Sequence, residues 1–107
     1  MTKVEFYTQG DRITGFCCSG HSGLAPAGED ILCAAVSAAV SLTECIINDV
    51  CGTRARVRVH EADAAVALQL PAACDEEDAI QAALSGLLVY LADLRDQYPD
   101  YLDVLEV

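Results

Sequence analysis

Hydrophobic and polar residues alternate along several short stretches of the chain, and a period of two residues is typical of β-strands. Five stretches have this character: KVEFYTQ (3–9), RITGFCCS (12–19), RARVRVHE (54–61), AAVALQL (64–70) and YLDVLEV (101–107). Gly10-Asp11 separates the first two stretches and Ala62-Asp63 separates the next two, so each pair is predicted to form a β-hairpin.

Two longer stretches have the character of helices. The first is opened by Asp30 as an N-cap, continues to about Val50 and is closed by Gly52. The second is DEEDAIQAALSGLLVYLADLRDQYP (75–99), which begins with acidic residues at the positive helix end and stops at Pro99. The pattern predicts one α+β domain over residues 1–107, with ββαββαβ order and a mostly antiparallel sheet on which two helices pack.

The first helix has a narrow polar stripe and a broad apolar arc when residues are placed 100° apart. Within about 80° of Cys33 lie the polar residues Ser37, Ser41, Glu44 and Asn48. On the opposite side lie Ile31, Ala35, Ala38, Leu42, Cys45 and Ile46. The pattern predicts that this apolar arc faces the core, and therefore that Cys45 is a core cysteine whereas Cys33 is not.

The second helix has more apolar positions than one face accommodates. Its core stripe is predicted to be Ile80, Leu84, Leu87, Leu91 and Leu94. Leu88 and Val89 widen this stripe beyond one face of the helix. A single chain of 107 residues is too small to bury all of this apolar surface. We therefore expect a homodimer.

Composition and charge narrow the classes of function. No run of about 20 apolar residues predicts a membrane span, and the start MTKVEFYTQG has no secretory signal pattern. We therefore expect a cytoplasmic protein whose six cysteines stay reduced. The chain has 17 acidic and 6 basic residues, a net charge of −11, which disfavours direct nucleic-acid binding and favours a basic partner.

A histidine and a cysteine lie close together in the stretch GHSGLAPAGEDILCAAVS (20–37). With Asp30 as N-cap, Cys33 falls near the third helical position, where the positive helix end favours a thiolate. A flexible loop precedes the helix and is able to bring His21 beside Cys33. A cysteine–histidine pair is sufficient for acyl transfer, because the thiolate attacks a carbonyl and the histidine protonates the leaving amine.

The surrounding residues have candidate supporting roles. Gly20, Gly23 and Gly28 give the loop its mobility. Asp30 either orients the histidine, as an acid does in a catalytic triad, or only caps the helix. Ser37 lies one turn after the cysteine and either hydrogen-bonds the site or bonds back to its own helix. First-turn N–H groups are candidate donors to a developing oxyanion.

Metal binding, thiol exchange and nucleotide binding are other chemistries to which residues of this kind contribute. Cys17 and Cys18 precede the loop, but adjacent strand residues point to opposite faces, and the C-x₂-C spacing of zinc sites is absent. We therefore predict no metal and no cofactor. Thiol exchange between one of these cysteines and Cys33 is an alternative. No G-K-[ST] follows the glycine loop, which argues against a nucleotide site.

A stripe of positive charge marks one face of the third predicted strand. It consists of Arg54, Arg56, Arg58 and His60, and a solvated face or a dimer contact is its expected role. His60 is second to His21 as a candidate base, because nothing in the sequence brings it toward a thiol.

The stretch GHSGLAPAGEDILCAAVSAAV (20–40) resembles the signature of the ribosomal-processing cysteine proteases, the Prp family of bacteria. The family pattern G-H-x-G-x-A-x-x-G-x-D-I-[VL]-C-A-A-V-S is matched at Gly20, His21, Gly23, Ala25, Gly28, Asp30, Ile31, Cys33 and Ser37. The similarity extends over the whole chain in length and element order. The loop departs from the family at Leu24, where Tyr is frequent, and at Pro26-Ala27, where charged residues are frequent.

The resemblance implies a small cysteine protease that removes a short N-terminal extension from the twenty-seventh protein of the large ribosomal subunit. It also implies a catalytic dyad of His21 and Cys33, a homodimer, and a loop that moves to admit the substrate. A basic ribosomal substrate agrees with the acidic charge of the chain. The alternative function is a non-catalytic ribosome-associated adaptor, or a thiol-redox protein, on the same fold.

Overall fold

Five strands and two helices follow one another in the predicted ββαββαβ order. The computed structural model describes residues 1–26 and 30–107. The strands are β1 (Thr2–Gln9), β2 (Arg12–Ser19), β3 (Arg56–His60), β4 (Ala65–Gln69) and β5 (Leu102–Glu106). The helices are α1 (Ile31–Glu44), continued by the π-helical turn η1 (Cys45–Val50), and α2 (Glu77–Gln97); a short 3₁₀ turn, η2 (Glu61–Asp63), joins β3 to β4.

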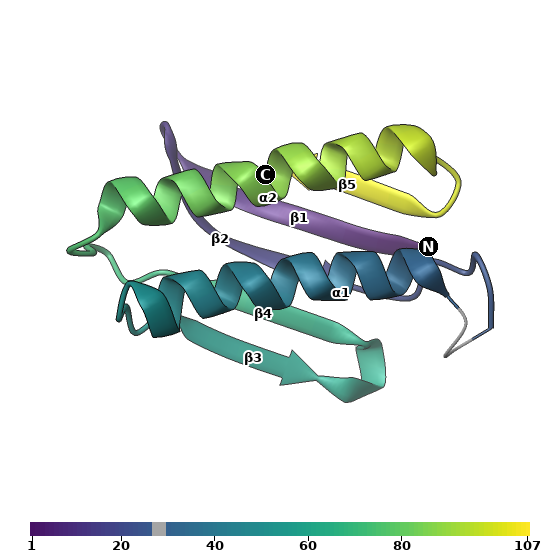
Figure 1. The fold of residues 1–107 in the computed structure, drawn as a ribbon, viewed down its shortest axis with the longest axis horizontal. Helices are drawn as coiled ribbons and strands as arrows, with labels where there is room; N and C mark the ends of the chain where they lie inside the picture. Colours follow the sequence, from purple (N-terminus) through teal and green to yellow (C-terminus); the bar gives the residue numbers. More distant parts are fainter. Residues whose placement is uncertain (27–29) are drawn as a thin grey trace.

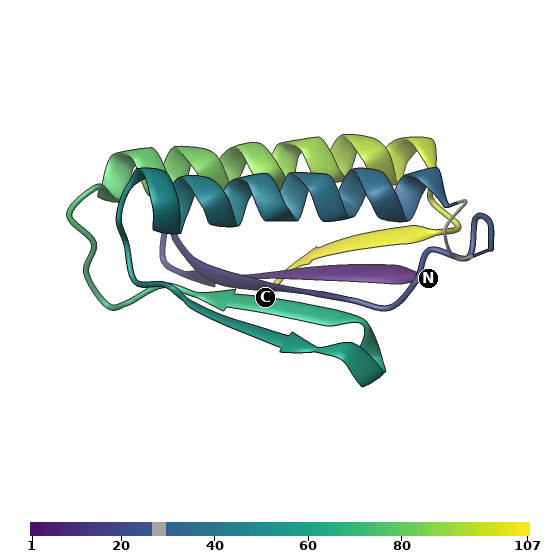
Figure 2. The same cartoon turned by 60° about the horizontal axis from the view of Figure 1, so that its bottom comes forward.

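The strands form one sheet in the order β3-β4-β2-β1-β5. Three of its strand pairs are antiparallel, and the pair β1–β5 is parallel. Both helices lie on one face of this sheet, side by side and antiparallel to each other (Figures 1 and 2). The expected fold class, a mostly antiparallel sheet with two helices packed on it, is confirmed.

The core lies between the sheet and the two helices. In the sheet, Phe6 on β1 is paired with Phe16 on β2, both rings are fully buried, and their centroids lie 6.0 Å apart. From α2 the predicted stripe of Ile80, Leu84, Leu87, Leu91 and Leu94 is buried against them. Burying large side chains of this kind contributes about 1.5–3 kcal/mol each.

The core face of α1 differs from the prediction. Its buried residues are Leu32, Val36, Val40 and Thr43, followed by Ile47 in η1. Ile31 and Leu42, which the helical wheel placed in the core, are 69% and 62% exposed. Cys45 is only half-buried.

The cause of this error lies in the composition of α1. Apart from its polar stripe the helix is apolar almost all round, so the periodicity does not identify which apolar arc meets the sheet. In the structure the sheet-facing arc is the one next to Cys33. The residues diametrically opposite the polar stripe, including Ile31 and Leu42, face outward.

One helical segment has the length and composition to cross a membrane: Ile31–Val50, with a window of mean hydropathy 1.8. The expectation that no run is long enough is therefore wrong by this measure. Here one side of the segment packs on the sheet through buried side chains such as Val36 and Ile47. A core helix passes the same test. This packing accounts for the apolar residues on the sheet side, whereas Ile31, Leu42 and Val50 remain exposed.

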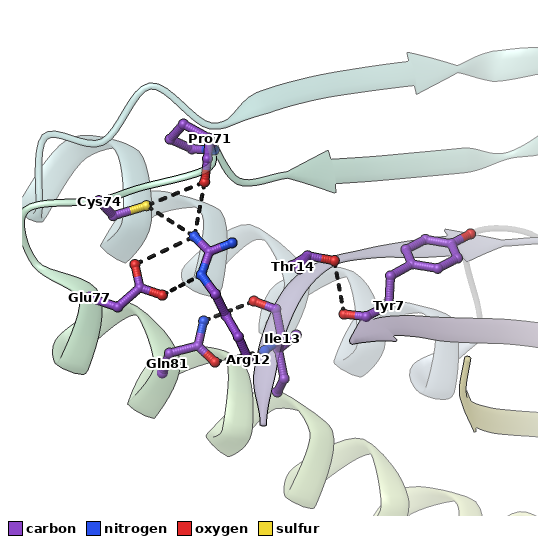
Figure 3. Close-up of polar contacts among 8 residues, drawn as sticks. All are labelled: Tyr7, Arg12, Ile13, Thr14, Pro71, Cys74, Glu77 and Gln81. Carbon is purple, nitrogen blue, oxygen red and sulfur yellow. Dashed lines mark hydrogen bonds and ion pairs between the residues drawn. The ribbon is translucent and has the colours of Figure 1, made fainter. Parts of the chain in front are cut away.

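A polar cluster fastens the start of α2 to the start of β2 (Figure 3). The register of β1 and β2 shifts between Tyr7 and Thr8. Beside this irregularity the side-chain amide of Gln81 accepts a hydrogen bond from the N–H of Ile13 and donates one to its carbonyl, both at 2.8 Å. The guanidinium of Arg12 pairs with Glu77 in the first turn of α2.

Candidate functional site

A cavity of about 790 Å³ opens between α1 and the β3–β4 side of the sheet. One wall is the polar stripe of α1, from which Cys33, Ser37, Ser41 and Glu44 line the cavity. The floor is apolar and includes Val57 on β3 and Val66 on β4. The polar stripe of the helical wheel thus lies on this wall, except for Asn48, whose side chain bonds both backbone groups of Ala55 instead.

Cys33 is the third residue of α1, as predicted. Asp30 is the N-cap, and its carboxylate accepts a hydrogen bond from the N–H of Cys33 at 2.9 Å. This bond satisfies one of the N–H groups that a helix leaves unpaired in its first turn. The cap fixes where the helix begins, so it fixes the place of the thiol at the end of the cavity.

Ser22 connects the loop after β2 to this cap. Its backbone N–H donates a hydrogen bond to the sulfur of Cys33 at 3.3 Å. Its hydroxyl donates to the second carboxylate oxygen of Asp30 and accepts from the N–H of Leu24 at 3.2 Å. Ser22 is only 2% exposed, so these partners replace water around its polar groups.

The carboxyl of Asp30 is held in its charged form. The hydrogen bond from the Ser22 hydroxyl, together with that from the N–H of Cys33, lowers the pKa of Asp30 from 3.8 to about 2. Hydrogen bonds to the ionised oxygens stabilise the charged state more than burial opposes it. The structure therefore gives Asp30 the capping role. In the described part of the chain its carboxylate bonds the Ser22 hydroxyl and the backbone of Cys33 and Ala25, and His21 is not among its partners.

Sequence reasoning missed Ser22. It lies in a loop, where neither the helical nor the strand period applies, and its neighbours Gly20 and Gly23 drew attention to backbone freedom instead. The one sequence signal for Ser22 is its position next to the candidate histidine, eight residues before the N-cap. The contact of its hydroxyl with Asp30 arises only when the loop folds.

The glycines of the loop have the backbone angles that were expected of them. Gly20 has a φ of 83° and Gly23 a φ of 75°. At Gly20 a Cβ atom would lie 2.6 Å from the carbonyl oxygen of Met1, so no larger residue fits there without displacement. Gly28, the third predicted loop glycine, lies outside the described residues.

His21 and Cys33 line the same cavity, together with Ser37. His21 is exposed at the cavity's edge, and within the described part of the chain no hydrogen bond joins its ring to Cys33. His60, the second candidate base, does not line the cavity and pairs with Asp63 at 2.7 Å on the exposed hairpin. The fold thus brings the preferred histidine to the cysteine's cavity and leaves the other outside.

Cys17 and Cys18 point to opposite faces of the sheet, as adjacent strand residues do. Cys18 lines the cavity with Cys33, and burial raises its pKa to about 11. Cys17 lines a shallow depression on the other face, bordered by Arg56 and Arg58. Among residues 1–26 and 30–107 no group of three or more His, Cys, Asp or Glu side chains is placed to hold a metal ion.

Solved structures with this fold include proteases. A crystal structure of the ribosomal processing protease Prp from S. aureus, in complex with a covalently linked product peptide, has a TM-score of 0.90 and 19% identity over 100% of both chains. The S. aureus Prp in complex with a substrate peptide has a TM-score of 0.85 and 18% identity over the same coverage. SMU.848 from Streptococcus mutans has a TM-score of 0.82 and 19% identity, covering 100% of this chain and 96% of that one.

At such identities these structures establish a common fold. No curated protein matches the chain. The family is established by a sequence model, described as cysteine protease Prp, which matches residues 1–103. Because this match spans almost the whole chain, the protein belongs to the Prp family of cysteine proteases.

Proposed function

We propose that the protein is an endopeptidase that removes the short N-terminal extension of a large-subunit ribosomal protein, the twenty-seventh, with Cys33 as nucleophile and His21 as acid and base. The observation that carries the proposal is the common cavity of these two residues, at the N-terminus of α1. The sulfur of Cys33 lies at the positive, N-terminal end of the α1 dipole, and it accepts a hydrogen bond from the N–H of Ser22.

The proposed reaction has two halves. The Cys33 thiolate attacks the scissile carbonyl, and the tetrahedral oxyanion is stabilised by first-turn N–H groups. Asp30 occupies the N–H of Cys33, so the candidate donors in that turn are the N–H groups of Ile31 and Leu32, which have no acceptor among residues 1–26 and 30–107. The imidazolium of His21 then protonates the departing amine, the C–N bond breaks, and the extension remains attached to sulfur as a thioester.

The second half releases the extension. Neutral His21 takes a proton from a water molecule, whose oxygen attacks the thioester carbonyl. The C–S bond breaks, the extension leaves as a free acid, and the sulfur and the imidazolium return to their starting states. No metal or redox partner is needed for this balance.

Two features support a ribosomal substrate. The chain carries a net charge of −11, which attracts a strongly basic protein through long-range electrostatics. The similar S. aureus proteins are ribosomal processing proteases seen with substrate and product peptides. Acting on a newly made ribosomal protein would place the enzyme in the cytoplasm, where its six cysteines stay reduced.

The protein is further proposed to act as a homodimer. Large apolar side chains remain exposed on the helices, namely Ile31, Leu42, Val89 and Tyr90, the first three at more than 60% of their surface. A second copy covering these residues would bury apolar area that the single chain leaves in water. Sedimentation of the purified protein at micromolar concentration is expected to give twice the chain mass of 11.3 kDa.

The alternative is a non-catalytic adaptor or a thiol-redox protein. Cys18 lines the same cavity as Cys33 and is the candidate partner for disulfide exchange. A protease predicts rapid alkylation of Cys33 that slows in His21→Ala. With a pKa of about 11, Cys18 is a thiolate in only about one molecule in 10⁴ at pH 7, so it would label slowly. An adaptor predicts uniform, slow labelling of both.

The experiment is a cleavage assay read by mass spectrometry. The purified protein is mixed with the host's ribosomal protein carrying its N-terminal extension, beside Cys33→Ala and His21→Ala. We expect one cut near the N-terminus by the wild type and none by either variant. Cleavage that survives Cys33→Ala would contradict the mechanism, and no cleavage by the folded wild type would favour the adaptor.

A further inference from the structure

One charged side chain of the cavity has no role in the chemistry described above. Among the described residues that line it, three carry a charge or can acquire one by protonation: His21, Asp30 and Glu44, the cysteines aside. Asp30 is bonded to Ser22 and to the N–H of Cys33. Glu44 is half-buried at the C-terminal end of α1, and no ion pair of the described chain includes it.

We propose that Glu44 is a specificity-determining residue, which selects substrates with a lysine or arginine about five residues before the scissile bond. This inference rests on the proposed function, because it requires that a peptide lies along the cavity with its scissile carbonyl at Cys33. It concerns which sequences are cut rather than how the bond is broken.

The position follows from the geometry of the helix. Cys33 and Glu44 are eleven residues apart on the same wall, and α1 rises about 1.5 Å per residue, so about 16 Å separates them along the helix axis. An extended peptide advances about 3.3 Å per residue. A peptide laid along this wall therefore brings a residue about five positions from the reacting carbonyl to Glu44.

The direction follows from the order of the two half-reactions. The segment before the scissile bond stays attached to Cys33 as the thioester, and it must be held in place while water attacks. On the helix side of Cys33 the lining of the cavity continues along α1 through Ser37 and Ser41 to Glu44. It is therefore assigned to that segment, whereas the released amine half leaves from the other side of the thiol.

Between Cys33 and Glu44 the surface of the cavity is apolar on the side of the sheet. Val40 from α1, Val57 from β3 and Val66 from β4 line it. Apolar side chains of the substrate contact these valines, and the low polarity strengthens the attraction between Glu44 and a cation at the end of the groove. A neutral or acidic substrate residue opposite Glu44 would remove water from the carboxylate without supplying a hydrogen-bond donor. Such a substrate would therefore bind more weakly.

The test compares a set of peptides in which a single lysine is moved from four to seven residues before the scissile bond, in an otherwise neutral sequence. The set also includes the neutral peptide and one with aspartate at the fifth position. The readout is kcat/KM for the wild type, Glu44→Gln and Glu44→Lys. Asp49→Asn is the matched control, because it removes one negative charge from the next helical turn outside the cavity.

The wild type is expected to cut the peptide with lysine at the fifth position about tenfold faster than the neutral peptide, the range of a charge-assisted hydrogen bond. Glu44→Gln is expected to remove this preference, because it slows cleavage of the lysine peptide and relieves the desolvation penalty on the neutral one. Glu44→Lys is expected to prefer aspartate at the same position, and Asp49→Asn to behave as the wild type. Equal preferences in Glu44→Gln and the wild type would overturn the proposal.

A binding measurement separates this inference from the proposed function. Fluorescence anisotropy of the labelled peptides is measured with Cys33→Ala, in which cleavage is excluded, with and without Glu44→Gln. The proposal predicts that lysine at the selected position lowers Kd about tenfold only when Glu44 is present. If the wild type cuts no peptide but this difference is found, the peptidase function fails and the Glu44 site stands. If cleavage occurs and the difference is absent, the Glu44 site fails.

Discussion

The backbone N–H of Ser22 donates a hydrogen bond to the sulfur of Cys33 across 3.3 Å. Through this bond the loop after β2 contacts the first turn of α1, and the hydroxyl of the same serine contacts Asp30. The sulfur is thus positioned from two directions, by the capped helix and by the loop. The sulfur also donates a hydrogen bond to the Ser22 hydroxyl at 3.6 Å, so both polar groups of this serine contact it.

Ser22→Ala is expected to reduce activity more than stability. The variant keeps the N–H that bonds the sulfur. It loses the hydroxyl that donates to Asp30 and accepts from the Cys33 thiol at 3.6 Å. A reacting group displaced by about 1 Å can lose on the order of 100-fold in rate, so we expect kcat/KM to fall by roughly ten- to 100-fold. Rates of Cys33 alkylation should fall in parallel.

The control for this variant is Ser85→Ala, an exposed serine on α2 far along the chain from the loop. It is expected to leave both rates unchanged. Wild-type activity in Ser22→Ala would show that the hydroxyl does not position the site.

Acid is expected to weaken the fold partly through Asp30. Its pKa is lowered from 3.8 to about 2, first by the hydroxyl of Ser22 and then by the N–H of Cys33. A lowered pKa means that the contribution of the carboxylate to stability is complete above pH 3.8 and is lost as pH falls through about 2. Between these values the unfolded chain binds up to about one proton more than the folded chain at this group.

Asp30→Asn isolates that contribution. Asparagine is also a good N-cap, so the variant is expected to fold. Denaturant titrations at several pH values are expected to show a shallower loss of stability between pH 4 and pH 2 than the wild type. An unchanged pH profile would contradict the charged cap.

Gly20→Ala tests the entry to the loop. Its φ of 83° is unfavourable for alanine by about 1–2 kcal/mol, and the added Cβ would lie 2.6 Å from the Met1 carbonyl oxygen. The variant should be destabilised by more than the backbone strain alone, and displacement of the adjacent His21 should lower kcat/KM. Thermal denaturation and the cleavage assay measure the two effects.

Replacing a second glycine, Gly86, is expected to raise the stability of the protein. Gly86 is exposed in α2, and a Cβ there would meet no atom within 4 Å. Gly86→Ala is therefore expected to stabilise the protein by about 0.5–1 kcal/mol with no change in activity. Val89 and Tyr90 lie on the same face one turn later, so a destabilised Gly86→Ala would indicate that the proposed second copy covers this face of α2.

Gln81→Ala tests how α2 is fastened to the sheet. The variant removes two hydrogen bonds of 2.8 Å and leaves both backbone groups of Ile13 without their partner (Figure 3). Unpairing such groups costs about 1–3 kcal/mol, so the midpoint of urea denaturation should fall accordingly. Gln97→Ala, which loses only an exposed bond to Asp93, should change stability by less than about 0.5 kcal/mol.

The fold was largely predictable from the sequence because its signals are local. Alternation marked each strand, Gly10-Asp11 marked the first hairpin, and Asp30 marked the start of α1. The core face of α1 was not predictable, because nearly the whole helix is apolar apart from one stripe. Its orientation depends on the neighbouring α2 and on the sheet, which local periodicity does not describe.

The site was predictable only in part, for a similar reason. The place of Cys33 follows from the cap, and the wall that includes Ser37 and Glu44 follows from the helical period. The contact of Ser22 with Asp30 joins residues eight apart through an irregular loop, and the floor at Val66 comes from a strand far along the chain. Such contacts are consequences of the tertiary fold.

The most direct test of the central claim is to trap the covalent intermediate. The protein is mixed with its extended ribosomal substrate, quenched in acid within the first turnover, and digested for tandem mass spectrometry. The account predicts that the N-terminal extension is attached as a thioester to the peptide containing Cys33, with deacylation slowed in His21→Ala. Attachment to another cysteine, or cleavage with no thioester at Cys33 and undiminished turnover in Cys33→Ala, would contradict it.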